Sequence, residues 1–257
     1  MISAEVFGAG LAAGAAVMTL AWIASLVRRD ASLADIAWGP ALAAIAWAAY
    51  AAGGQPEASL PIAAVITFWA ARLAAHIALR HTGEDRRYVE MRERQGASFP
   101  LRSLISVFLV QAGVAWLVSL PILALASTAP EPRPLLIAGL LIALAGLATE
   151  TVGDLQLTRF RMEDHGRDAV LDTGLWHYSR HPNYFGDALF WWGIWIAVVI
   201  AAPGLWWTLA GPALMTFFLL RVSGVVLLER SIGERRPAYR EYVERTSAFV
   251  PLPPRKR

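Results

Sequence analysis

The chain has 257 residues, of which 56% are hydrophobic and only 17% are charged, and its formal net charge is +3. This composition leaves too little polar surface for a soluble globule of the same size, so it predicts an integral membrane protein of the all-α, polytopic class. The absence of cysteine excludes disulfides, thiolate metal sites and cysteine catalysis. We expect no metal site and, without a soluble basic module, no nucleic-acid binding.

Seven apolar runs, each with about the 20 residues that a helix needs to cross a bilayer, follow one another along the chain. They cover residues 5–27, 32–52, 60–79, 104–126, 135–157, 184–202 and 205–228. The first run has no basic segment before it, so it is expected to be a retained helix and not a cleaved signal. The sequence predicts one seven-helix membrane domain over residues 1–257.

Basic residues gather in the connections on one side of the predicted bundle. Twenty of the 23 Lys and Arg residues directly follow the first run or lie in the loops at about 80–102, 158–182 and 230–257. Short loops rich in Lys and Arg stay in the cytoplasm, so we expect an outside N-terminus, a cytoplasmic C-terminus and a site that opens to the cytoplasm. Attraction to anionic lipid headgroups is an alternative explanation of the same arginines.

An acidic residue begins the second predicted span. Asp35 stands in the segment SLADIAWGP, three residues after Ser32. One interpretation is that Asp35 caps the helix, a role for which Ser32 is equally suited. In the other, the Asp35 carboxyl group lies in an apolar pocket, keeps its proton and donates a hydrogen bond to a substrate carbonyl.

Charged residues also occur inside other predicted spans, where each costs roughly 2.5–3.5 kcal/mol on insertion and needs a partner or a role. They include Arg72, His76 and Arg80 on one face of the third span, Glu150, Asp154 and Arg161 along the fifth, and Asp187 on the sixth. One interpretation is that acids and bases pair across the bundle. The other is a pocket at the cytoplasmic ends, in which carboxylates accept hydrogen bonds from ribose hydroxyls or a carboxamide and arginines bind phosphates.

The most informative stretch is TGLWHYSRHPNYFGDALFWWGIW at 173–195, where a polar cluster meets a long apolar run. Pro182 has no backbone donor and is preset for a first helical turn, so a helix is predicted to begin at Pro182 or Asn183. The free N–H groups at this start, with Arg180 and His181 beside them, suit the phosphate of a nucleotide or of a lipid.

The tail after the last span alternates basic and aromatic residues, from Arg236 onward. This pattern predicts a short interfacial helix. Tyr239, Tyr242 and Phe249 either anchor the chain at the membrane boundary or close over a bound nucleotide.

Together these motifs resemble those of the membrane-embedded steroid 5α-reductase family and, more closely, of its bacterial relatives. The resemblance is carried by GLWHYSRHPNYFGD, the stripe from Glu150 to Arg161, GEDRRY at 83–88 and the ending YREYVERTSAFVP. It covers the C-terminal half well and the first three spans weakly. It implies a bacterial inner-membrane enzyme with NADPH in a cytoplasmic-side pocket. The reaction that it implies is reduction of the carbon–carbon double bond of an α,β-unsaturated ketone, typically a 3-oxo-Δ4 steroid that enters from the bilayer.

The resemblance also implies roles for particular residues. The cofactor contacts are Asp154, Arg161, Tyr178, Asn183, Asp187, Arg87, Arg236 and Tyr239. Asp35 stands for a carboxylate that, with a tyrosine of the third span, holds the substrate carbonyl. No tyrosine aligns here, so His76 or a neighbour is expected in its place. Hydride transfer to the β-carbon develops negative charge on the carbonyl oxygen, and donors aimed at that oxygen lower the barrier.

Two other functions stay open on the sequence alone. A membrane methyltransferase that uses S-adenosylmethionine on an isoprenylcysteine or a lipid also has an Arg-His-Pro-x-Tyr turn, like that at 180–184. It needs an acidic pair near its last span, whereas here Glu229 is followed by Arg230, and the NYFGD and FVP stretches favour the reductase. A non-enzymatic protein that binds lipids or sterols is the third interpretation. The oligomeric state is open.

Overall fold

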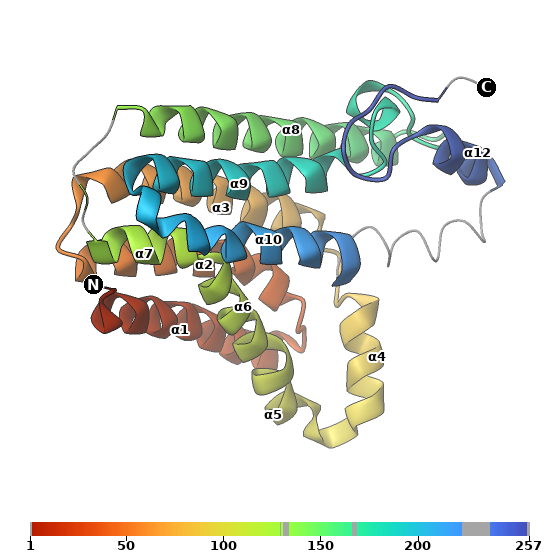
Figure 1. Cartoon of the computed structure of the whole chain (residues 1–257). Coiled ribbons are helices and arrows are strands. Elements are labelled where there is room, and N and C mark those ends of the chain that lie inside the picture. Colours follow the sequence, from red (N-terminus) through yellow and green to blue (C-terminus); the bar gives the residue numbers. More distant parts are fainter. Residues whose placement is uncertain (1, 129, 131–133, 166–168, 223–236, 256–257) are drawn as a thin grey trace. The chain divides into compact units, whose positions relative to one another are not determined.

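The structure, a computed structural model, describes residues 2–128, 130, 134–165, 169–222 and 237–255. Within these residues the fold is all-α, and seven helical segments are long and apolar enough to cross a membrane (Figure 1). They are Ala4–Arg28, Leu33–Ala52, Glu57–Arg80, Arg86–Val118, Leu136–Met162, Pro182–Ala201 and Pro203–Arg221. The predicted fold class and number of spans are confirmed, and the chain is an integral membrane protein. The orientation of the spans stays a prediction.

The chain divides into two compact units, each described here by itself. Unit 1 comprises Met1–Leu136 and Val198–Gly211, and unit 2 comprises Ile137–Ala197 and Pro212–Arg257. Unit 1 contains α1 (Ala4–Arg28), α2 (Leu33–Ala52), α3 (Leu60–Arg80), α4 (Arg86–Gln95), α5 (Phe99–Ser103), the π-helical segment Leu104–Leu109, α6 (Val110–Val118), α7 (Leu120–Thr128) and the 3₁₀ turns Glu57–Ser59, Gly96–Ser98 and Pro203–Leu209. Unit 2 contains nearly all of α8 (Leu136–Met162), the 3₁₀ turn Gly174–His177, most of α9 (Pro182–Ala201) and α10 (Ala210–Phe217), the π-helical segment Phe218–Val222, and α12 (Pro237–Arg245). The single domain expected from the sequence stays a prediction.

Helix α2 lies at the centre of unit 1, where it packs against α1, α3, α6 and α7. Most residues of its buried face are small, and they are Ala34, Ala37, Gly39, Ala41, Leu42, Ile45, Ala46 and Ala49. A Cβ atom at Gly39 would lie only 2.7 Å from the carbonyl oxygen of Ala70 on α3. Small residues let membrane helices approach closely, which is how such helices gain packing energy where lipid provides little hydrophobic drive.

The fourth span differs from its prediction. The sequence predicts one helix over 104–126, whereas the helical run that begins at Arg86 ends at Val118 and α7 begins at Leu120. Pro121 is the physical reason, because it cannot donate to the carbonyl four residues earlier and its ring crowds that carbonyl. The span is therefore longer on its N-terminal side and interrupted on its C-terminal side.

In unit 2, α8 and α9 approach each other along glycines that recur every seven residues. These are Gly139, Gly146 and Gly153 on α8 and Gly186 and Gly193 on α9, and we call them the glycine seam. A Cβ atom at Gly146 would lie 2.4 Å from the backbone nitrogen of Phe190, and one at Gly186 would lie 2.4 Å from that of Glu150. Seven residues make about two helical turns, so the glycines share one face of each helix. Figure 1 shows the two helices side by side.

The second half of the chain agrees with two further predictions. Helix α9 begins at Pro182, the residue predicted from its missing donor. Helix α12 lies in the tail where a short helix is expected. The last span begins with a 3₁₀ turn at Pro203, and its predicted end at 223–228 lies outside the described residues.

Candidate functional site

The side chain of Asp35 joins α2, α4 and α6 in unit 1. The Tyr88 hydroxyl donates to Asp35 Oδ1 at 2.8 Å, and Arg87 Nη2 donates to Asp35 Oδ2 at 3.0 Å. Gln111 Nε2 lies 3.4 Å from both Asp35 Oδ1 and the Tyr88 hydroxyl oxygen. We call these four residues the Asp35 cluster. Both oxygens of its carboxylate accept hydrogen bonds, and a guanidinium balances its charge.

The loop before α4 is tied to the start of α2 by hydrogen bonds. Asp85 caps α4 by accepting from the backbone nitrogen of Arg87 at 2.9 Å, and its own backbone nitrogen donates to Ser32 Oγ at 2.7 Å. Glu84 Oε1 accepts from the backbone nitrogen of Ala31 at 2.8 Å. These bonds fix the first turn of α4, from which the arginine and the tyrosine of the Asp35 cluster project.

The capping interpretation of Asp35 is corrected. Asp35 is not a helix cap, since its oxygens accept from side chains of other helices, and Ser32 makes no side-chain cap bond to α2. His76 Nε2 lies 2.8 Å from the Arg80 guanidinium, and the expected role of His76 at a substrate carbonyl stays a prediction. The tyrosine that does contact Asp35 is Tyr88, on the helix after the third span.

The contacts of Asp35 add a second hydrogen-bond donor to the expected chemistry. The Tyr88 hydroxyl donates to Asp35 Oδ1, so it is a second candidate donor beside the carboxyl group, whose role as a proton donor stays a prediction. Tyr88 is buried, with 5% of its surface exposed. A buried hydroxyl held by a carboxylate is a preorganised hydrogen-bond donor.

Arg87, which the resemblance implies as a cofactor contact, pairs with two acids of unit 1. Its Nε atom donates to Asp85 Oδ1 at 2.9 Å, and its Nη2 atom donates to Asp35. Partial burial disfavours the charged form of Asp85, but the hydrogen bonds and the positive charge of Arg87 outweigh that effect and lower the pKa of Asp85. These contacts indicate that Arg87 positions Asp35, and its cofactor role stays a prediction.

Three acids lie buried on the two helices of the glycine seam. Glu150, Asp154 and Asp187 have exposed fractions of 3%, 5% and 7%. Asn183, in the first turn of α9, donates its Nδ2 to Asp154 Oδ1 at 3.0 Å, and Gly153 lets the start of α9 come this close to α8. Asn183 Oδ1 is buried, and no described residue donates to it. The structure thus brings Asp154 and Asn183 together and leaves a buried acceptor beside them.

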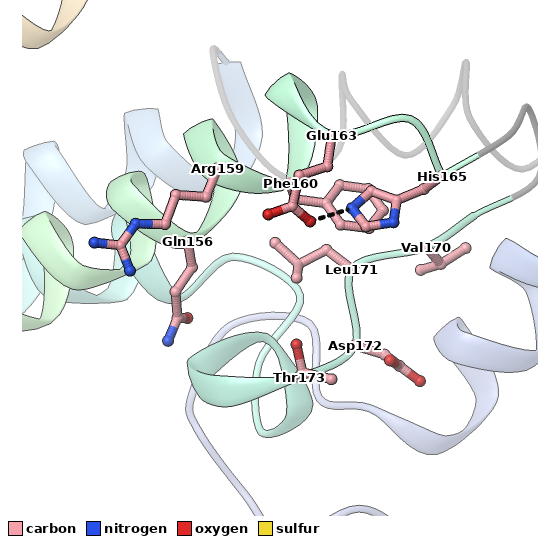
Figure 2. A pocket seen from close by; sticks show the side chains of 9 residues that line it. All are labelled: Gln156, Arg159, Phe160, Glu163, His165, Val170, Leu171, Asp172 and Thr173. Carbon is pink, nitrogen blue, oxygen red and sulfur yellow. Dashed lines mark ion pairs between the residues drawn. The ribbon is translucent and has the colours of Figure 1, made fainter.

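An open groove of about 330 Å³ lies at the C-terminal end of α8 (Figure 2). It is lined by Gln156, Arg159, Phe160, Glu163, His165, Val170, Leu171, Asp172 and Thr173. The rings of Phe160 and His165 stack with their centroids 4.3 Å apart, and Glu163 pairs with His165 at 2.9 Å. Arg161, a predicted cofactor contact, is exposed at the same end of α8. The volume is at the low end of the roughly 300–1,000 Å³ of small-molecule pockets.

Arg180 connects the start of α9 to the tail of the chain. It is 7% exposed, and its Nη1 atom donates to the carbonyl oxygens of Val243 and Thr246 at 2.9 and 2.6 Å. Its backbone nitrogen donates to the carbonyl oxygen of Ser247 at 2.8 Å. The Nη1 donors of Arg180 therefore hold the tail, and binding of a phosphate by this guanidinium stays a prediction.

The aromatic residues of the tail pack within unit 2. The Tyr242 hydroxyl donates to the carbonyl of Trp176, and the Phe249 ring meets Phe185 edge to face at 5.8 Å. Burial, and after it the neighbouring Tyr239, raises the pKa of Tyr242, so its hydroxyl keeps the proton that it donates. Tyr239, a predicted cofactor contact, is 8% exposed. These contacts support a structural role for Tyr242 and Phe249.

Two predicted cofactor contacts, Tyr178 and Arg236, remain to be placed. Tyr178 is 45% exposed, and its carbonyl oxygen accepts from the backbone nitrogen of Leu252 at 3.0 Å. Arg236 lies outside the described residues. Among the residues that the structure does describe, no group of three or more His, Cys, Asp or Glu could hold a metal ion.

Comparison with known proteins identifies the family of the chain but not its activity. The model of the family described as "Protein of unknown function (DUF1295)" matches residues 21–246, so the chain belongs to that family. Neither a curated protein nor a solved structure matches it.

Proposed function

We propose that this member of the DUF1295 family is a membrane reductase that uses NADPH to reduce the carbon–carbon double bond of a lipophilic α,β-unsaturated ketone. The observation that carries the proposal is the Tyr88 hydroxyl, which is buried and held 2.8 Å from the Asp35 carboxylate. Arg87 and Gln111 complete the hydrogen bonds of that carboxylate. A donor in such surroundings suits an oxygen atom that becomes negative during a reaction.

The chemistry expected of the Asp35 cluster follows from its hydrogen bonds. When a ketone oxygen approaches, the O–H bond of Tyr88 rotates, so that the hydroxyl donates its hydrogen bond to that oxygen and no longer to Asp35. Asp35 keeps the hydrogen bonds from Arg87 and Gln111, so the exchange does not leave the half-buried carboxylate without donors. As a hydride reaches the β-carbon, electrons move onto the ketone oxygen, and the hydroxyl stabilises the charge there. The α-carbon takes up a proton afterwards.

Unit 2 provides acceptors that fit a dinucleotide. Bound NADPH would supply the hydride, and the residues of this chain would orient it. Asn183 Oδ1 is buried without a donor from the described residues, and a carboxamide or a ribose hydroxyl would satisfy it. Asp154, hydrogen-bonded to the same asparagine, is a second acceptor. Arg161 and Arg159, exposed at the end of α8, are the side chains that would bind phosphates.

Thermal unfolding of the purified protein in detergent tests the cofactor. A ligand that binds only the folded state raises the melting temperature, so NADPH should stabilise the protein and S-adenosylmethionine should not. The Asp154→Ala and Arg161→Ala variants should each weaken the NADPH response. Arg102→Ala, which removes an exposed arginine from unit 1, is the control and should respond like the wild type. Stabilisation by S-adenosylmethionine alone would select the methyltransferase, whose acidic residue Glu229 lies outside the described residues.

Turnover tests the second half of the proposal. A 3-oxo-Δ4 steroid is a suitable first enone, with loss of the conjugated double bond as the readout. Asp35→Ala should retain the NADPH-induced rise in melting temperature and lose most turnover, since Tyr88 then has no carboxylate to hold it. Full turnover by Asp35→Ala would assign the carbonyl to other residues.

A further inference from the structure

A second groove lies in unit 1, at the end of α1 where the helix gives way to basic residues. It encloses about 370 Å³. Leu26 and Arg29 line it from the end of α1, Arg92 lines it from α4, and Phe99 and Pro100 line it from α5. We call it the Arg29 groove. It combines two guanidinium groups with an apolar wall.

The walls of the Arg29 groove are tied together. The indole nitrogen of Trp22 on α1 donates to the carbonyl oxygen of Pro100 at 2.8 Å. The Arg92 guanidinium lies 4.5 Å from the centre of the buried Phe99 ring and donates to both oxygens of Glu84, at 3.0 and 2.6 Å. A guanidinium has five N–H donors, so Arg92 keeps donors for a ligand after binding Glu84.

Arg29 gives the groove its excess charge. It follows the last turn of α1 with a left-handed backbone, φ 52°, and its backbone nitrogen donates to the carbonyl oxygen of Ser25. Its side chain is exposed, and no acid in the described part of the chain pairs with it. Glu84 balances Arg92, whereas the charge of Arg29 is not balanced within the groove. The groove therefore has an unbalanced positive charge, which a bound anion would neutralise.

Exposed apolar side chains follow the groove-lining residues in the sequence of α1 and α5. On α1, Leu26 is 39% exposed and Val27 is 82% exposed, and on α5, Leu101 is 72% exposed. Because these segments belong to apolar spans, such side chains suit the acyl region of a bilayer. We propose that the Arg29 groove binds the phosphate headgroup of an anionic phospholipid, whose acyl chains lie against these side chains. A free anion would use the arginines but not the apolar wall.

The proposal is tested on the full chain in non-ionic detergent, with thermal stabilisation measured against added phosphatidylglycerol. Phosphatidylcholine with the same acyl chains and inorganic phosphate are titrated in parallel. Phosphatidylglycerol should stabilise the protein saturably and more strongly than phosphatidylcholine, and millimolar phosphate should have no effect. One arginine near an anionic lipid contributes about 1 kcal/mol, so Arg29→Gln should weaken the apparent affinity about fivefold.

Arg28→Gln is the matched control, because it removes the same charge one residue earlier and Arg28 does not line the groove. Its affinity should stay within about twofold of the wild type. Equal losses in both variants would show that the basic belt attracts lipid without a site, and equal stabilisation by inorganic phosphate would show a soluble ligand; either result overturns the proposal. If Arg29→Gln does not fold, Arg29→Lys carries the test. It keeps the charge but loses the planar fork, so an unchanged affinity would also count against the groove.

Discussion

The two units hold their polar groups in place by different means. In unit 1 the Asp35 cluster is joined by side-chain hydrogen bonds between three helices, and loop contacts fix the first turn of α4. In unit 2 Asp154 meets Asn183 because the glycine seam lets the backbones of α8 and α9 touch. The geometry of the Asp35 cluster therefore depends on single polar atoms, and that of Asp154 and Asn183 depends on the absence of side chains along the glycine seam.

The two regions also differ in what they offer a ligand. The Asp35 cluster contains one acid, balanced by Arg87, and one hydroxyl donor. The region around Asp154 and Asn183 is rich in acceptors. A donor suits an oxygen that gains charge, and acceptors suit hydroxyl and amide groups that do not. Because side-chain hydrogen bonds hold one region and close backbone contact holds the other, we expect substitutions in the two regions to have different effects on stability and turnover.

The largest effect is expected from adding one methyl group to the glycine seam. In Gly146→Ala the new Cβ atom would lie 2.4 Å from the backbone nitrogen of Phe190, and a backbone atom cannot move aside as a flexible side chain can. Overpacking of this kind costs typically about 1–3 kcal/mol and occasionally more, and we expect a loss of about 3 kcal/mol or more. The melting temperature and the yield of folded protein in detergent measure it.

Gly113→Ala on α6 is the matched control, because nothing lies within 4 Å of the Cβ atom that it adds. Alanine is the better helix former, so this variant should be unchanged or up to about 1 kcal/mol more stable. Equal melting temperatures for the two variants would mean that backbone contact does not support unit 2.

The second effect concerns a single atom of unit 1. Tyr88→Phe removes the proposed carbonyl donor and keeps the ring, so the fold and the NADPH-induced stabilisation should persist. Removal of one preorganised donor to a developing negative charge costs about 10²–10³ in kcat, and we expect a loss of that size in enone turnover. The readouts are kcat and the melting temperature with and without NADPH.

Tyr50→Phe provides the control, since the Tyr50 hydroxyl on α2 has no hydrogen bond to any described residue. Its turnover should equal that of the wild type. A Tyr88→Phe variant that turns over the enone at the wild-type rate would remove the observation on which the proposed function rests.

The spans could be predicted from the sequence because a bilayer offers the backbone no hydrogen bonds, so each crossing must be a long apolar helix. The start of α9 could also be predicted, because Pro182 lacks a backbone donor and suits the first turn of a helix. Pro121 carries the same kind of signal, but its run is apolar on both sides, and hydropathy alone joins the two helices into one. Composition therefore predicts that a span exists better than it predicts where the span breaks.

Side-chain partners were harder to predict because they depend on which helices meet. Tyr88 and Gln111 are 53 and 76 residues from Asp35, and no local pattern joins them. The only signals in the sequence were the motif GEDRRY, which ends at Tyr88, and the single amide of Gln111 in an apolar run. The contacts of Arg180 with the tail were missed for the same reason, since the carbonyls that it binds are more than 60 residues away.

The smallest effect is expected in the loop that fixes α4, and it depends on pH. Asp85→Asn keeps the helix cap, because Asn caps about as well as Asp, but it removes the charge beside Arg87. The pKa of Asp85 is lowered on folding, so the carboxylate stabilises the folded state above its ordinary value of 3.8, and this contribution is lost as the pH falls through the lowered value. The variant should lose about 0.2–1 kcal/mol at pH 7.

Melting temperatures from pH 7 to pH 3 test this expectation and the contrast between the units. The difference between wild type and Asp85→Asn should shrink below pH 3.8, where the wild-type carboxylate takes up its proton. Gly146→Ala changes no titratable group, so its penalty should be the same across this range. A constant penalty for Asp85→Asn would mean that the charge of Asp85 does not hold α4. In that case packing would govern the geometry of unit 1 as it does that of unit 2.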